Sequence, residues 1–131
     1  MLINLSNHPA YKIENEEKIY IWDGEQLNAI SQYGEIVNLP FPNIPPDYTT
    51  EQVFDLATEY MNKCVTLIQS SNDESAIHIT GEMTFCFVLI QLLLKEGYTC
   101  IASTTERIVE EKDGVKKSVF KFVRFRNYKL L

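Results

Sequence analysis

Short apolar segments alternate along this chain with stretches whose apolar residues recur at helical spacing, and this alternation constrains the fold most strongly. The apolar segments predict strands at residues 1–5, 35–39, 76–80 and 99–102. The periodic stretches predict helices at residues 25–33, 53–68 and 82–96, the second of them behind a Thr49–Gln52 capping box. Such alternation indicates an α/β fold, with an open, mostly parallel sheet and helices on both faces.

The end of the chain has a different pattern. Residues 106–112 and 117–126 are predicted to be two strands around Asp113-Gly114, a dipeptide typical of tight hairpins. We expect this C-terminal antiparallel hairpin, residues 106–126, to form one edge of a single domain that spans residues 1–131. Residues 10–22 do not fit the alternation, and an inserted ribbon and an irregular loop are both open for them.

Composition indicates an ordinary globular protein, because 45% of the 131 residues are hydrophobic and 23% are charged. The longest uncharged apolar run, residues 83–94, is about half the length of a membrane span. The N-terminus lacks the pattern of a signal peptide. We therefore expect a cytoplasmic protein without a membrane partner. Three cysteines lie in apolar segments and are predicted to be buried free thiols: Cys64, Cys86 and Cys100.

The last third of the chain is basic, although the net charge is −6. Residues 95–131 contain 9 of the 12 Lys and Arg residues. Two interpretations remain open, a solvated hairpin and a local field for a small anionic ligand. Long nucleic acid is disfavoured because a duplex binder needs a broader basic face. The cations in question are Arg107, Lys116, Lys117, Lys121, Arg124 and Arg126.

Polar residues follow three of the predicted strands, at Ser6-Asn7-His8, Gly81-Glu82-Met83-Thr84 and Ser103-Thr104-Thr105. In a parallel sheet ligands bind beyond the carboxyl ends of the strands, near the point where strand order reverses. Gly81 would let the backbone approach a ligand, and the helix behind it would offer free amide hydrogens to an anion. Neither a P-loop nor a dinucleotide-binding glycine motif is present, so no cofactor is expected.

Four segments resemble a known family: NLSNHP, YGEIVNLPFP, HITGEMTF and CIASTTERIV. They resemble the Csx-fifteen family, small accessory proteins of type III CRISPR loci that are grouped with ring nucleases and other handlers of cyclic oligoadenylate. The resemblance implies a Rossmann-like domain that binds a ring of adenylates, and cyclic tetra-adenylate is the ring that we expect. It also implies a symmetric homodimer, and it leaves open whether the ring is cut.

For such a ligand, the predicted phosphate and ribose contacts are Ser6, Asn7, Ser103, Thr104 and Thr105, with Gly81 and Thr84 beside them and Arg107 as a bidentate phosphate ligand. Each Ser or Thr, taken alone, is also typical of a cap or turn. Glu82 either complements the dipole of its own helix or accepts from a ribose hydroxyl or an adenine amino group. His8 is either a general acid or base toward a 2′-hydroxyl or a loop residue that binds the ring. His78 is predicted to be a core histidine.

Three functions remain open. In the first, the protein sequesters cyclic oligoadenylate and so lowers type III CRISPR signalling. In the second, it is a metal-independent ring nuclease in which His8, Ser103 and Thr104 assist transfer to a 2′,3′-cyclic phosphate. No metal-binding motif is present, so a metal nuclease is disfavoured. In the third, the basic hairpin makes the protein an adaptor for an acidic protein partner.

Overall fold

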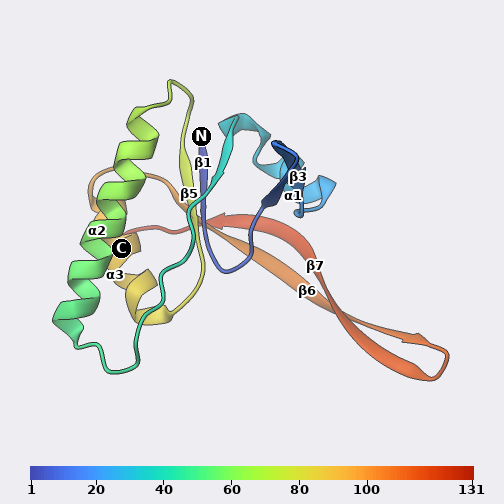
Figure 1. The fold of residues 1–131 in the computed structure, drawn as a ribbon. Coiled ribbons are helices and arrows are strands. Elements are labelled where there is room, and N and C mark those ends of the chain that lie inside the picture. Colours follow the sequence, from blue (N-terminus) through green and yellow to red (C-terminus); the bar gives the residue numbers. More distant parts are fainter.

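The computed structural model describes all 131 residues and contains a five-stranded sheet with the order β4-β1-β5-β6-β7 (Figure 1). Four of its strands are parallel, namely β1 (Leu2–Leu5), β4 (Ile36–Asn38), β5 (Ala76–Ile79) and β6 (Cys100–Lys112). The last strand, β7 (Val115–Asn127), runs antiparallel to β6. This confirms the predicted mostly parallel sheet with a C-terminal antiparallel pair.

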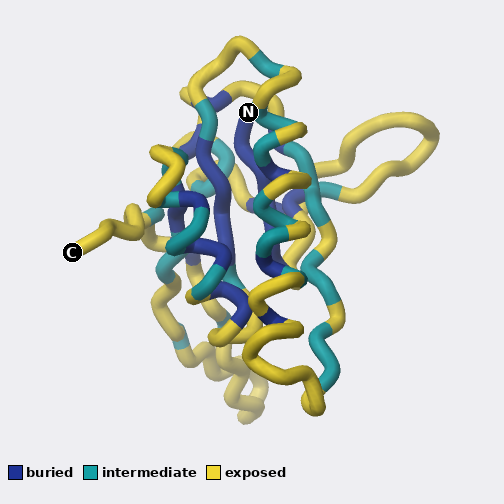
Figure 2. The backbone as a smooth tube through the Cα atoms, turned by 90° about the vertical axis from the view of Figure 1, so that its left-hand side faces the viewer, coloured by how far each residue is buried: buried dark blue, intermediate teal, exposed yellow.

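Helices cover both faces of the sheet. The long helices α2 (Thr50–Gln69) and α3 (Met83–Lys95) pack on one face, while α1 (Gly24–Ala29) and the 3-10 turn η1 (Ser31–Tyr33) lie on the other. Figure 2 shows the buried residues along the strands and on the helix sides that face them. The capping box predicted for α2 is present, because the side chains of Thr49 and Gln52 each accept from the other's backbone N–H.

Alternation along the strands divides the core between the two faces. Ile3 and Ile77 belong to the larger cluster, with α2 and α3. Leu2, Ala76 and Ile101 belong to the smaller one, which contains Trp22 and residues of α1 and η1. Because side chains alternate along a strand, the polar residues at positions 4 and 78 lie on the same face as the smaller cluster.

Residues 10–22 form an inserted ribbon, one of the two alternatives that the sequence left open. Strands β2 (Tyr11–Glu14) and β3 (Glu17–Tyr20) pair only with each other. Positive φ angles of 48° and 65° at Asn15 and Glu16 make the tight turn. The ribbon returns to the sheet where the amides of Ile21 and Trp22 donate to the Ala10 carbonyl.

The C-terminal hairpin differs from the prediction at its base. β6 is one continuous strand, so Ser103, Thr104 and Thr105 lie within a strand and not in a loop at its end. β6 pairs with β5 only at Cys100 and Ile101, and beyond them it continues on β7 alone. A bulge follows Thr104, and residues 105–122, here called the arm, project from the body as a twisted ribbon (Figure 1). Its turn is the predicted Asp113-Gly114, with φ angles of 53° and 77°.

Neither long helix contains an apolar stretch that could cross a bilayer. The three cysteines are free and buried, as predicted. Burial raises the pKa of Cys64 and of Cys100 to about 12 and that of Cys86 to about 11. These thiols therefore stay protonated at neutral pH and behave as small apolar groups.

Candidate functional site

A row of hydrogen-bonded polar side chains crosses the four parallel strands, near the carboxyl ends of β1, β4 and β5 and at the base of the arm in β6. Asn38 of β4, Asn4 of β1 and His78 of β5 are direct neighbours in the strand register. Ser103 of β6 extends the row beyond His78, and Ser6 follows β1. We call these five residues the polar row. Asn4, Ser6 and His78 are buried, so their polar groups depend on one another for hydrogen bonds.

The amide of Asn4 is the centre of this row. Its Nδ2 donates to the His8 carbonyl oxygen at 2.9 Å and to Asn38 Oδ1 at 3.2 Å. A carbonyl oxygen can only accept, so the His8 contact fixes which end of the amide is the donor. Asn4 Oδ1 is therefore an acceptor, and it lies 2.9 Å from both Ser6 Oγ and His78 Nδ1.

The fixed amide determines the tautomer of His78. Nδ1 must carry the hydrogen that Asn4 Oδ1 accepts, which leaves Nε2 with a free lone pair in the neutral ring. Ser103 Oγ lies 3.1 Å from Nε2 and donates to it. The chain of hydrogen bonds thus runs in one direction, from Ser103 through His78 to Asn4 and from there to the His8 carbonyl.

The surroundings keep His78 uncharged. The ring is 3% exposed and meets Trp22 and Phe125 edge-on, with centroids 5.3 and 5.6 Å apart. Burial lowers the pKa of His78 to about 4, and the imidazole of His8 adds a smaller effect in the same direction. His78 is neutral at pH 7, and the prediction that it is a core histidine is confirmed.

Of the three ligand-binding residues predicted in the loop after β1, one is buried and two are exposed. Ser6 is buried, and its hydroxyl meets Asn4 Oδ1 and both backbone groups of His8, which closes the loop. Asn7 and His8 are exposed at the carboxyl edge. Asn7 borders two shallow depressions of about 400 and 340 Å³, which also share Phe41. Of this predicted trio, Asn7 and His8 are therefore the residues open to a ligand.

Gly81 has a different role from the one expected. The sequence predicted that its missing side chain makes room for a ligand, but the ring of Phe41 occupies that space. A Cβ at position 81 would lie 2.3 Å from two atoms of the ring. Phe41 in turn packs edge-on against Phe85 of α3, with centroids 5.3 Å apart. The missing side chain of Gly81 thus allows Phe41, in the loop after β4, to pack against Phe85 of the core.

Substituting Gly81 by alanine is expected to lower the free energy of unfolding by about 1 to 3 kcal/mol, because the new methyl group overlaps the Phe41 ring. Urea denaturation measures the loss. Gly24→Ala is the matched control, since nothing lies within 4 Å of a Cβ there. Shortening Phe41 to leucine in the Gly81→Ala background should recover part of the loss, and strictly additive effects would argue against the contact.

Glu82 caps the helix that it precedes. Its carboxylate accepts from the backbone N–H groups of Thr84 at 3.1 Å and Phe85 at 2.8 Å, and from the Thr84 hydroxyl at 2.7 Å. The Phe85 N–H above all, and then the Thr84 hydroxyl, lower the pKa of the Glu82 carboxyl. These amides are bound by the protein's own carboxylate, whereas the sequence predicted free amides for an anion. This geometry matches the first of the two roles predicted for Glu82, which was to complement the dipole of its own helix. The Thr84 hydroxyl, predicted as a ligand contact, donates to the Glu82 carboxylate.

The residues predicted from β6 are spread along that strand. Thr104 donates its hydroxyl hydrogen to the Arg124 carbonyl at 3.1 Å, and Thr105 is exposed beyond the bulge. Arg107 lies on the arm, where its guanidinium donates to Ser118 Oγ from two nitrogens at 3.1 and 2.9 Å. Arg107 is therefore held on the arm and is not part of the polar row.

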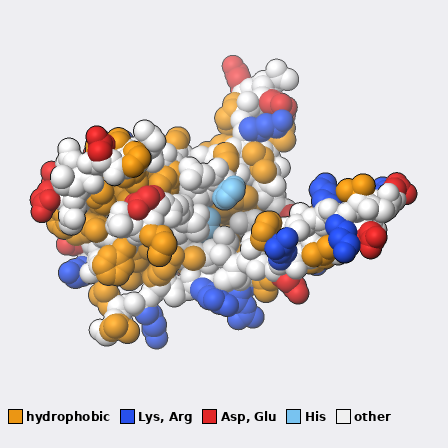
Figure 3. Space-filling view, turned by 90° about the horizontal axis from the view of Figure 1, so that it is seen from below, with side chains coloured by type: hydrophobic (Ala, Val, Ile, Leu, Met, Phe, Trp, Pro, Cys, Tyr) orange, Lys and Arg blue, Asp and Glu red, His pale blue; other side chains and the backbone are white.

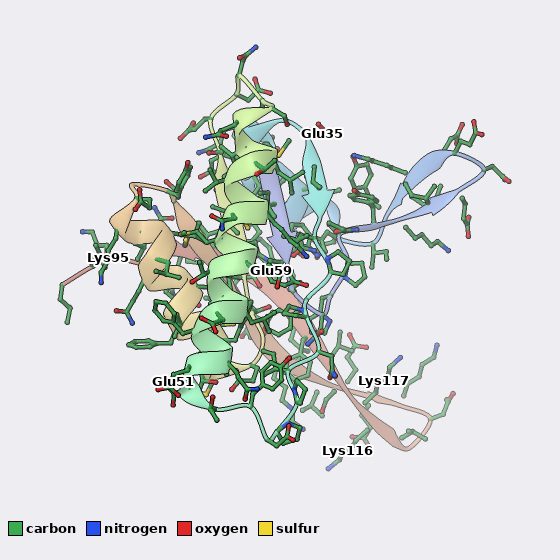
Figure 4. All side chains as sticks on the ribbon, turned by 60° about the vertical axis from the view of Figure 1, so that its left-hand side comes forward. Glu35, Glu51, Glu59, Lys95, Lys116 and Lys117 are labelled. Carbon is green, nitrogen blue, oxygen red and sulfur yellow. The ribbon has the colours of Figure 1, made fainter.

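Two other cations are closer to the edge. Arg124 and Arg126 pair with Thr104 and Ala102 at the base of the arm, and neither forms an ion pair. Ser103 pairs with Phe125 between them, so the two arginines leave the ribbon on the face opposite Ser103. Lys116 and Lys117, by contrast, lie at the far end of the arm (Figure 4).

The carboxyl edge of the sheet presents the exposed residues Asn7 and His8. Figure 3 looks onto this edge from below, with histidine near the centre and the arm projecting to one side. Asn4 and Asn38 hold the row together and were not among the site residues predicted from the sequence. The available signal was a polar residue inside a short apolar strand, as in LINL and IVN.

Comparison with known proteins connects the chain to one family. The model of the uncharacterized protein MJ1673 family matches residues 1–126, which include the whole polar row and the arm. No curated protein and no solved structure is significantly similar to the chain. With all but the last five residues matched, the chain belongs to the uncharacterized protein MJ1673 family.

Proposed function

We propose that this chain binds cyclic oligoadenylate at the carboxyl edge of its sheet and lowers type III CRISPR signalling by sequestering the messenger. Cyclic tetra-adenylate is the first ring to test. The observation that carries the proposal is the meeting of the four segments that resemble the Csx-fifteen family. They are far apart in sequence, yet one hydrogen-bonded row joins residues from all of them: Asn4 and Ser6, Asn38, His78, and Ser103.

The strand order supports a Rossmann-like fold and a ligand at this edge. The parallel strands run β4-β1-β5-β6, and the chain reverses its direction of progress between β1 and β5. The connection through α1 lies on one face, and those through α2 and α3 lie on the other. In doubly wound sheets ligands bind at the carboxyl ends beside such a reversal. Asn4 and His78 lie on the two strands that flank it.

The chemistry of the edge suits a ring that carries phosphates, riboses and adenines. Arg124 and Arg126 are exposed cations without an acidic partner. Asn7 and His8 offer exposed polar groups, and the depressions beside Asn7 are shallow. One subunit therefore offers a half-site and not an enclosed pocket. Two copies related by a twofold axis would supply two half-sites to a symmetric ring, as a homodimer or within a larger assembly.

Replacing Arg124 and Arg126 together by alanine is expected to weaken binding of cyclic tetra-adenylate by about 1.5 to 3 kcal/mol, through the loss of charge-assisted phosphate contacts. Isothermal titration calorimetry measures the change. Arg107→Ala is the matched control and should bind like the wild type, because Arg107 is held on the arm by Ser118. A loss confined to Arg107→Ala would place the phosphates on the arm and contradict this site.

The same purified protein separates sequestration from cleavage. Incubation with excess cyclic tetra-adenylate followed by chromatography should return the intact ring. Binding ranks above cleavage because two of the three catalytic candidates are engaged within the protein: Ser103 donates its hydroxyl hydrogen to His78 Nε2, and Thr104 donates its own to the Arg124 carbonyl. Linear products at multiple turnover that disappear in His8→Ala would establish the ring nuclease instead. If no cyclic oligoadenylate binds below millimolar concentration, the adaptor hypothesis takes precedence.

A further inference from the structure

The hydroxyl of Ser103 is the member of the polar row that is both half-exposed and bonded to the buried His78. Its single hydrogen is directed at His78 Nε2, and the direction of that bond follows from the fixed amide of Asn4. Rotating the hydrogen toward a ligand would leave a buried ring nitrogen without a donor, which is unfavourable. Ser103 therefore presents lone pairs, and not a hydrogen, to whatever binds at the edge.

The Thr104 hydroxyl, like that of Ser103, can only accept a hydrogen bond from a ligand. Its hydroxyl hydrogen is donated to the Arg124 carbonyl oxygen, so its remaining hydrogen-bonding capacity is also that of an acceptor. A phosphate oxygen is itself an acceptor and gains nothing from such a group. The exposed cations Arg124 and Arg126 suit phosphate, and they lie on the ribbon face opposite Ser103, which Thr104 shares as the pairing partner of Arg124. At the base of the arm, the Ser103 hydroxyl therefore lies on one face and the two arginines lie on the other.

We infer that Ser103 recognises a hydrogen-bond donor of the bound ring, the adenine 6-amino group or the ribose 2′-hydroxyl, while the phosphates bind at the arginines. This inference rests on the proposed function for the identity of the ligand. It replaces the expectation that Ser103 and Thr104 contact phosphate oxygens. It also makes Ser103 a specificity residue, because an analogue without the donor leaves the serine lone pair without a partner.

The first test needs no ligand. Two-dimensional NMR of protein labelled with ¹⁵N at histidine, at neutral pH, should show the hydrogen of His78 on Nδ1 and none on Nε2. Ser103→Ala should shift the Nε2 resonance, whereas Ser118→Ala, a matched substitution on the arm, should not. If the hydrogen is found on Nε2, His78 donates to Ser103 and the serine hydrogen is free for a ligand. That result would overturn the inference, whatever the protein binds.

The second test uses three rings in calorimetry: cyclic tetra-adenylate, its inosine counterpart without the amino group, and its 2′-O-methyl counterpart without the hydroxyl donor. Wild-type protein should bind one of the two analogues about tenfold more weakly than the parent ring, which identifies the donor. Ser103→Ala should lose about tenfold for the parent ring and no longer distinguish it from that analogue. Ser103→Thr, which keeps a hydroxyl, and Ser118→Ala should retain the discrimination.

The outcomes separate the two proposals. Binding of all rings with unchanged discrimination in Ser103→Ala overturns the role of Ser103 and leaves the proposed function standing. Equal affinity of the wild type for all three rings would also overturn the role of Ser103 and leave the proposed function standing. A wild-type protein that binds none of the three overturns both proposals.

Discussion

Replacing Asn4 by leucine is expected to lower the free energy of unfolding by about 3 kcal/mol, although the two side chains are similar in size. The substitution leaves His78 Nδ1–H without its acceptor in a buried site and removes one of the two donors that reach the His8 carbonyl. A buried polar group that loses its partner costs about 1 to 3 kcal/mol, and the losses here fall within one network. Urea denaturation monitored by circular dichroism measures the difference.

Asn7→Leu is the control for Asn4→Leu. It is the same chemical change three residues away on an exposed side chain, and a shift within about 0.5 kcal/mol is expected there. Equal stability of the two variants would show that the polar row contributes little to the fold. A second sign of the network is the His78 NMR signal, which should move in Asn4→Leu and stay in place in Asn7→Leu.

Acidification from pH 6.5 to pH 4 is expected to remove about 3 kcal/mol of stability through His78 alone. The pKa of His78 is about 4 in the folded protein and near 6.5 in the unfolded chain, so between these values the unfolded chain binds the proton first. Each pH unit in this window costs about 1.4 kcal/mol. The contribution is fully present above pH 6.5 and is lost as the pH falls toward 4.

The measurement is the free energy of unfolding as a function of pH in the wild type and in His78→Gln. The variant lacks the buried imidazole, and its stability should fall less steeply between pH 6.5 and 4, where carboxylates account for the remaining slope. His8→Gln removes the exposed histidine and should keep most of the wild-type slope. Parallel curves for the wild type and His78→Gln would contradict the neutral, buried state of His78.

Local signals predicted most of the fold. The capping box at Thr49, the alternation of strands and helices, and the turn at Asp113-Gly114 depend on neighbouring residues, and all three are present. The end of strand β6 was predicted wrongly because the partner of that strand changes from β5 to β7 near Ser103. Nothing in the local sequence marks such a change, since it depends on pairing with residues more than 20 positions away.

The candidate site was predicted only in part for the same reason. A glycine at position 81 indicates that a group comes close, but the group is Phe41, 40 residues earlier in the chain. A polar residue in a buried strand indicates a buried hydrogen bond, but the choice of His78 as the partner of Asn4 depends on strand register. Sequence thus indicated which positions are unusual, and the fold determines what each of them meets.

The arm has a consequence for how this protein meets its surroundings. In a ribbon of only two strands, alternate backbone amides and carbonyls point outward, away from the partner strand, and are hydrated. Beyond Ile101 neither border of the arm is covered by a third strand, and Val109 and Phe120 on it are more than half exposed. The arm is accordingly a template onto which a further extended segment can be laid edge to edge, with backbone hydrogen bonding that does not depend on the sequence of the incoming chain.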